Sequence, residues 1–222
     1  MTNLKSETQL KQIGLFGGLT DEELAAIAEI TTRRSYPKNA IIINEGDDTD
    51  SLYLILSGKV KIVLSDEDGK EVIISILEPG DYFGELSLID SEPRSARVVT
   101  MGDCQFSIIH KSDFNNVLDS NPGLVRNLLS GLTKRLRAAN KNIESLALMD
   151  VYGRVARTLL QFAKDVDGKK IITEKLTQKD IAHMVGASRE MVSRIFKDLT
   201  IGGYISVESG RITINDKLPA NY

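Results

Sequence analysis

Hydrophobic and polar positions along the chain change their spacing twice, and the first change separates a short helix from a strand-rich region. Thr20 and Glu23 form a capping box ahead of LAAIAEI, whose apolar residues follow helical spacing, so a helix is expected from about Asp21 to Ile30. From residue 36 to residue 110, short runs of Ile, Val, Leu and Tyr alternate with Gly, Asp, Glu and Pro. This pattern predicts an all-β barrel or roll.

The second change comes near Ser112, where helical spacing returns. From Pro122 to Met149, apolar residues recur at intervals of three and four, as in the a/d seam of a coiled coil. The seam residues are Leu129, Leu132, Leu136, Ala139, Ile143 and Leu146. A helix of about 42 Å, at 1.5 Å per residue, is longer than a small domain covers well. We therefore expect a homodimer through a parallel coiled coil over 122–149; the alternative is a helix packed on its own roll.

The C-terminal part predicts a compact mixed domain. A helix is expected from Val151 to about Asp165, followed by a loop over residues 165–168. Two segments with alternating polarity, residues 204–207 and 211–214, predict a β-hairpin wing.

A helix-turn-helix pattern lies ahead of this hairpin. Thr177 and Asp180 form a second capping box, Gly186 interrupts the helical spacing, and Ser188 is suited to begin the next helix.

This next helix carries polar residues at i, i+3, i+4 and i+7 opposite its apolar face. Arginine can bond guanine bidentately, glutamate can accept from cytosine, and a recognition helix makes such contacts near its N-terminus. The candidate DNA contacts are Ser188, Arg189, Glu190, Ser193, Arg194 and Lys197, with Thr177, Lys179 and Arg211 for phosphates. The alternative is a solvated charged surface.

Composition narrows the class of protein. The 222 residues, 41% hydrophobic and 27% charged, favour two domains of an ordinary globular protein. We expect no membrane segment or secretory signal, and the single Cys104 excludes an internal disulfide and favours the reducing cytoplasm. Residues 150–222 hold 12 Lys and Arg against 9 Asp and Glu, although the whole chain carries −3. This excess hints at a polyanionic partner, but chance composition explains it equally well.

One stretch, FGELSLIDSEPRSA at residues 83–96, brings a carboxylate and a guanidinium into one turn-rich place. A pocket for a hydroxylated sugar and a phosphate needs such a pair. The alternative is an Arg–Glu pair that closes a turn.

The order of β-roll, long helix and winged helix-turn-helix resembles the Crp/Fnr superfamily of transcription regulators over nearly the whole chain. VGASREMVSRIFKDL is similar to its recognition helix, LALMDVYGRVARTLLQFAK to its hinge and following helix, and FGELSLIDSEPRSA to the phosphate-binding cassette of cyclic-nucleotide-binding domains. The resemblance implies an α+β fold with a jelly-roll domain (1–121), a dimerisation helix (122–149) and a winged helix-turn-helix domain (150–222).

The resemblance also implies the ligand contacts. Glu85 would accept the ribose 2′-hydroxyl and Arg94 would bind the cyclic phosphate. The full implied set is Gly84, Glu85, Leu86, Ser87, Arg94, Ser95 and Ala96. Where the family's activator has Thr and Ser for the base, this chain has Ala139 and Asn140. Only Asn140 can hydrogen-bond through its side chain, so Asn140 joins the expected set as the contact to the base, from either subunit. Cyclic AMP is favoured over cyclic GMP by the family alone.

Other chemistry finds little support. An iron–sulfur cluster takes four cysteines, a haem sensor needs an axial histidine in the roll, and His110 at a strand end fits a structural role. No catalytic or metal-binding motif stands out, so we expect no enzyme and no metal. The expected function is a ligand-gated transcription regulator that binds palindromic double-stranded DNA and contacts RNA polymerase. The rivals are a regulator of this fold with another effector or none, and a nucleotide-binding regulatory subunit.

Overall fold

The computed structural model describes residues 8–174, 176–208, 210–215 and 218, which divide into two compact units. Among these residues, the first unit comprises 8–66 and 74–137, and the second comprises 67–73 and those from 138 onward. The boundary between the units falls inside the long helix, whereas the sequence placed domain boundaries at its two ends. The three-part division by sequence therefore stays a prediction.

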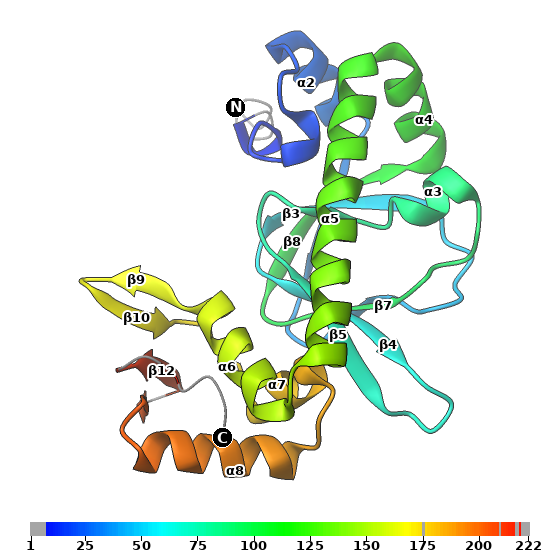
Figure 1. Ribbon diagram of the computed structural model, residues 1–222. Helices are drawn as coiled ribbons and strands as arrows, with labels where there is room; N and C mark the ends of the chain where they lie inside the picture. The colour runs from blue at the N-terminus through cyan, green and yellow to red at the C-terminus, as the bar shows by residue number, and fades with distance from the viewer. Residues whose placement is uncertain (1–7, 175, 209, 216–217, 219–222) are drawn as a thin grey trace. The chain divides into compact units, whose positions relative to one another are not determined.

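The first unit contains the expected β-roll, apart from the first three residues of β5, which the division assigns to the second unit (Figure 1). In the described residues, two four-stranded sheets have the orders β1-β8-β3-β6 and β2-β7-β4-β5. The strands are β1 (Thr32–Tyr36), β2 (Ile41–Ile43), β3 (Ser51–Ser57), β4 (Val60–Ser65), β5 (Glu71–Leu77), β6 (Tyr82–Phe83), β7 (Arg97–Thr100) and β8 (Cys104–His110). The last of these strands ends at the residue where the sequence pattern predicted it.

Strand β3 serves two hydrophobic cores because its side chains alternate between the two faces of its sheet. Ile55 lies in the core between the sheets, which also holds Phe106 and the buried Cys104. Leu52 and Leu54 point to the other face, where helices cover the sheet. Burying a side chain of this size contributes about 1.5–3 kcal/mol.

Short helices and the long helix make up that cover. They are η1 (Gly14–Phe16), α2 (Asp21–Glu29), α4 (Lys111–Ser120) and α5 (Pro122–Leu148), and a short helix α3 (Leu86–Asp90) follows β6. The capping box of Thr20 and Glu23 is present at the start of α2, as predicted. Among the described helices, none has an apolar stretch long enough to cross a lipid bilayer.

The long helix α5 has one buried face and one exposed apolar face. Leu124 and Leu128 are buried in the core, whereas Leu136 and Ile143 are both 63% exposed. Leu132, which the sequence assigned to the exposed seam, is partly buried against the core instead. The reason is that its position on the helix lies at the border between the two faces.

The second unit contains a helix-turn-helix and a second sheet. Its helices are α6 (Val151–Phe162), α7 (Gln178–Val185) and α8 (Arg189–Ile201), and its strands are β9 (Lys164–Val166), β10 (Lys169–Ile172), β11 (Ile205–Glu208) and β12 (Arg211–Ile214). The strand order in the described sheet is β11-β12-β10-β9. The predicted wing is the β11–β12 pair.

The loop predicted over residues 165–168 is instead part of a hairpin. Strands β9 and β10 pair antiparallel, and α6 ends at Phe162, earlier than expected. Asp167 and Gly168 have φ values of 52° and 75°, which suits the two-residue turn of a tight hairpin. The Asp-Gly pair was the available signal, but the all-exposed β9 lacks the alternation that identifies a strand.

Local capping fixes the ends of the helix-turn-helix. The Thr177–Asp180 capping box begins α7, and Gly186 ends it in the left-handed region at φ 62°. The Ser188 hydroxyl accepts a hydrogen bond from the Met191 N–H and so caps α8. These caps define the glycine turn between the two helices.

Candidate effector pocket and DNA-binding surface

Arg94 is a buried cation held by neutral groups. Only 4% of Arg94 is exposed. Its guanidinium donates hydrogen bonds to the Gly84 carbonyl at 2.6 Å, the Ser51 carbonyl at 2.7 Å and the Thr49 hydroxyl at 2.9 Å. Burial lowers the pKa of Arg94, while Asp50 and other charged groups at longer range oppose that effect. None of the ion pairs in the described part of the chain includes Arg94. Its positive charge is therefore uncompensated at close range.

Gly84 makes this arrangement possible. Its φ of +87° lies in the left-handed region, which glycine adopts without strain. A Cβ at this position would lie 2.7 Å from Arg94 Nη1 and 2.8 Å from the Ser51 carbonyl oxygen. Both the conformation and the space at position 84 therefore require glycine.

Glu85 is the second charged group, and its partner was missed by sequence reasoning. The Glu85 side chain is 3% exposed, and its Oε1 accepts a hydrogen bond from Arg135 Nη1 on α5 at 2.6 Å. Arg135 also donates from Nη2 to the Tyr82 carbonyl, and its guanidinium lies 4.7 Å from the centre of the Tyr82 ring. Nothing in the local sequence relates residue 135 to residue 85, because the two are 50 positions apart.

The other predicted ligand residues lie close in sequence to Glu85 and Arg94, within residues 84–96. Leu86 and Ser87 are the first two residues of α3, and N–H groups at this end of a helix have no intrahelical partner. Ser87 is 8% exposed, and its buried hydroxyl makes no hydrogen bond in the described residues. Ala96 is buried and Ser95 is exposed. The structure thus brings together the backbone and side chains of residues 84–87 and 94.

Asn140 is not part of that arrangement in the structure. It is an exposed residue of α5 in the second unit, five positions after Arg135. Its contact with the base of an effector stays a prediction. The neighbouring Ala139 is also exposed.

An aromatic cluster lies beside the Arg94 group. Tyr53 and Phe83 stack with ring centres 4.9 Å apart, and Phe106 meets both rings edge-on. Burial raises the pKa of Tyr53, an effect that the nearby charge of Arg94 partly opposes. Tyr53 therefore stays a neutral phenol at ordinary pH.

The candidate DNA-binding surface is the outer face of α8. Its inner face buries Val192, Ile195, Phe196 and Leu199 against the rest of the second unit. The residues predicted to meet DNA, which are Ser188, Arg189, Glu190, Ser193, Arg194 and Lys197, are all exposed. Hydrogen bonds from its own backbone N–H and from Ser188 lower the pKa of Glu190, so its carboxylate stays ionised as an acceptor.

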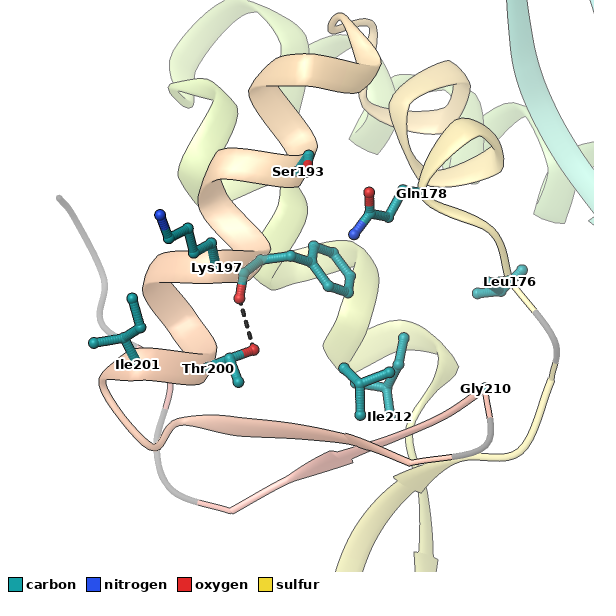
Figure 2. A pocket seen from close by; sticks show the side chains of 10 residues that line it. Leu176, Gln178, Ser193, Lys197, Thr200, Ile201, Gly210 and Ile212 are labelled. Carbon is teal, nitrogen blue, oxygen red and sulfur yellow. Dashed lines mark hydrogen bonds between the residues drawn. The ribbon is translucent and has the colours of Figure 1, made fainter.

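A groove lies between α8 and the wing (Figure 2). Its volume is about 460 Å³, and Ser193 and Lys197 lie along one side of it. Gln178 reaches toward the groove from the start of α7, and sequence reasoning did not select this residue. The groove therefore has an amide and a hydroxyl at its edge, and its apolar lining includes Ile212.

The predicted phosphate contacts lie on different elements of the same unit. Lys179 is exposed on the first turn of α7, and Arg211 is exposed at the start of β12. Thr177 already uses its hydroxyl in the helix cap, donating to Asp180 at 2.6 Å. Among the described residues, no group of three or more His, Cys, Asp or Glu could hold a metal ion.

Two family models match separate segments of the chain. Residues 33–121 match the cyclic nucleotide-binding domain family, and residues 153–217 match the Crp-like helix-turn-helix domain family. The chain is 35% identical over 211 residues to the CRP-like cAMP-activated global transcriptional regulator of Mycobacterium tuberculosis, covering 93% of this chain and 94% of the relative. It is 36% identical over 186 residues to the cAMP-activated global transcriptional regulator CRP of Pasteurella multocida, covering 81% and 88%.

The chain is also similar to solved structures. The catabolite activator protein of Thermus thermophilus is 30% identical, with a TM-score of 0.55 over 91% of this chain and 93% of that structure. The c-di-GMP responsive regulator CLP of Xanthomonas campestris is 23% identical, with a TM-score of 0.78 over 89% of this chain and all of that structure, and shows the fold alone. The chain therefore belongs to the Crp/Fnr family of ligand-gated, DNA-binding transcription regulators.

Proposed function

We propose that this protein is a homodimeric regulator whose binding to a palindromic operator is switched by cyclic AMP. The observation that carries the proposal is the Arg94 guanidinium, which is buried and has only neutral hydrogen-bond partners. A buried charge without a counter-ion is costly, and a bound anion offsets that cost. Guanidinium groups bind phosphate through charge-assisted, often bidentate hydrogen bonds.

Glu85 is the proposed binding group for the ribose of the nucleotide. Its Oε1 is used by Arg135, whereas its Oε2 accepts no hydrogen bond in the described residues. A carboxylate oxygen in this position can accept the 2′-hydroxyl of a ribose. A phosphate held by Arg94 and a hydroxyl held by Glu85 together favour a ribonucleotide. The names of the relatives favour cyclic AMP over cyclic GMP.

The exposed apolar face of α5 supports a dimer. Leu129, Leu136, Ile143 and Leu146 are between 52% and 63% exposed in the single chain. Their spacing suits a two-chain coiled coil, which would remove them from water. Two paired chains would present two α8 helices about 34 Å apart, one turn of DNA, and so match a palindromic site.

Gating would then act through the paired α5 helices. Nucleotide bound at Glu85 and Arg94 favours one arrangement of the helix pair, and this arrangement sets the spacing of the two α8 helices. Because such coupling is reciprocal, operator DNA raises nucleotide affinity by the same factor as nucleotide raises DNA affinity. The regulator would act in the cytoplasm, where nucleotide and DNA are both available.

RNA polymerase is the proposed protein partner. The β9–β10 hairpin carries Lys164, Lys169 and Lys170 as exposed cations, with Lys164 paired to Glu174. Lys169 and Lys170 line a groove of about 620 Å³ together with the half-exposed Leu160. A surface that combines cations and an apolar floor suits a protein partner.

Calorimetric titration with cyclic AMP and cyclic GMP tests the effector. Wild-type protein should bind cyclic AMP more tightly, and Arg94→Leu should lose at least about 100-fold in affinity, as expected for two charge-assisted hydrogen bonds. Arg94→Lys keeps the positive charge but lacks the planar, bidentate guanidinium, so its affinity should lie between those of wild type and Arg94→Leu. Arg33→Leu, at an exposed arginine of β1, is the matched control and should bind normally.

DNA binding measured by fluorescence anisotropy decides between the rivals. Operator affinity should rise on adding cyclic AMP in the wild type and stay unchanged in Arg94→Leu. If neither nucleotide binds and the operator is bound equally well without them, the protein is a regulator of this fold with another effector or none.

A further inference from the structure

Gly131 lies in the middle of α5, where glycine is a poorer helix former than alanine. A Cβ at this position would lie well under 3.0 Å from the Tyr82 hydroxyl oxygen, closer than real Cβ contacts occur. With a side chain at residue 131, either the helix or the Tyr82 ring would have to shift. A Cβ added at Gly123, in the same helix, would lie in open space.

Tyr82 in turn holds Arg135. The Arg135 guanidinium lies over the Tyr82 ring, and its Nη2 donates to the Tyr82 carbonyl. Arg135 follows Gly131 by four positions, so both residues lie on the same face of α5. The Tyr82 ring thus contacts this face at two points one helical turn apart.

The Tyr82 hydroxyl itself makes no hydrogen bond among the described residues, although it is buried. Burial raises the pKa of this phenol, with the Arg135 charge opposing, so the group stays neutral. Packing in the hydrophobic core and against Gly131 and Arg135, and not a hydrogen bond of the hydroxyl, therefore holds the ring in position.

We propose that Tyr82 and Gly131 are positioning residues that couple the effector site to α5. The Tyr82 ring packed against Gly131 sets the position of α5 so that Arg135 reaches Glu85. Nucleotide bound at Glu85 then acts on α5 through Arg135. This inference rests on the proposed function, because it assumes that Glu85 binds the effector.

A double-mutant cycle tests the packing without any ligand. Gly131→Ala should lower the unfolding temperature although alanine is the better helix former, whereas Gly123→Ala should raise it or leave it unchanged. Tyr82→Phe removes the unpaired hydroxyl and should be neutral or stabilising. The double variant Gly131→Ala/Tyr82→Phe should recover most of the loss. Equal behaviour of the two glycine variants would overturn the packing step.

Titration with cyclic AMP tests the coupling. Gly131→Ala should bind the nucleotide about tenfold more weakly, which corresponds to about 1.4 kcal/mol. Gly123→Ala should bind normally, and the double variant should recover wild-type affinity. A purely structural role would lower stability without changing nucleotide affinity in the folded protein.

The two ways of failing are distinguishable. If wild-type protein binds cyclic AMP and Gly131→Ala binds it equally well, the coupling inference is wrong and the proposed function stands. If wild-type protein binds neither cyclic AMP nor cyclic GMP, the effector assignment fails and the coupling inference fails with it.

Discussion

Arg154 on α6 donates a hydrogen bond from Nε to the carbonyl oxygen of Val185, the last residue of α7, at 2.8 Å. Its Nη1 donates to the carbonyl oxygen of Met149, just after α5, also at 2.8 Å. Cations are favoured at helix C-terminal ends, where carbonyl groups lack partners. One side chain thus joins the end of the long helix to the turn of the helix-turn-helix.

Replacing the Arg154 side chain should remove both hydrogen bonds and destabilise the second unit. Arg154→Ala should lower the free energy of unfolding by about 3–6 kcal/mol, since it removes two charge-assisted hydrogen bonds. Arg157→Ala is the control, because Arg157 makes one hydrogen bond of 3.1 Å to the Lys141 carbonyl at an exposed position. Urea unfolding followed by circular dichroism would compare them, and equal losses would argue against a special role for Arg154.

Gly84→Ala should damage the candidate effector site more than an ordinary loop substitution does. The added Cβ meets Arg94 and a backbone carbonyl, and overpacking of this kind costs about 1–3 kcal/mol beyond the strain of a positive φ. Gly69→Ala has a similar φ of +76° with open space, so it should show the strain alone. Unfolding and nucleotide titration of both variants would separate the two contributions.

Two substitutions on the DNA side should have different effects. Arg189→Ala should cost about 1–3 kcal/mol on the operator and relax its sequence preference. Lys179→Ala should weaken binding to all sequences alike and reduce the salt dependence by about one phosphate contact. Anisotropy with operator and random duplexes at several salt concentrations measures both. An equal loss for Arg189→Ala on random DNA would make Arg189 a phosphate contact.

A charge in the exposed seam of α5 should dissociate the dimer. Leu136→Glu would place two unpaired carboxylates in the coiled-coil core, and a cost of several kcal/mol corresponds to at least about 100-fold weaker association. Lys134→Glu changes charge on an exposed position outside the seam and should leave the dimer intact. Analytical ultracentrifugation would show the difference, and an unchanged sedimentation coefficient for Leu136→Glu would rule out this seam.

Local signals made most of the fold predictable. The capping boxes at Thr20 and Thr177 involve residues three positions apart, so their sequence signature is complete in itself. The run of Leu, Tyr and Ile in β3 and the 3–4 spacing in α5 likewise depend on near neighbours in the chain. The β9–β10 hairpin was missed because both faces of β9 are exposed and therefore carry no periodic signal.

The candidate site was only partly predictable for the same reason. Glu85 and Arg94 lie in one recognisable stretch, and the structure shows both buried, although their contacts with an effector remain predictions. In the sequence, Arg135 is one of several charged residues of the long helix, and nothing distinguishes it from the others. Only the fold shows that it meets Glu85, since their contact depends on how α5 packs against β6 and the turn that follows it.

The buried position of Cys104 has a practical consequence for studying this protein. Burial raises the pKa of its thiol, and the residue is 3% exposed, so maleimide reagents should leave it unmodified under native conditions. A cysteine introduced on the surface would then be the one reactive thiol of the chain. Spin labels or fluorophores could be attached there without first replacing the native residue, and distances between labelled subunits could report the motion that ligand binding produces.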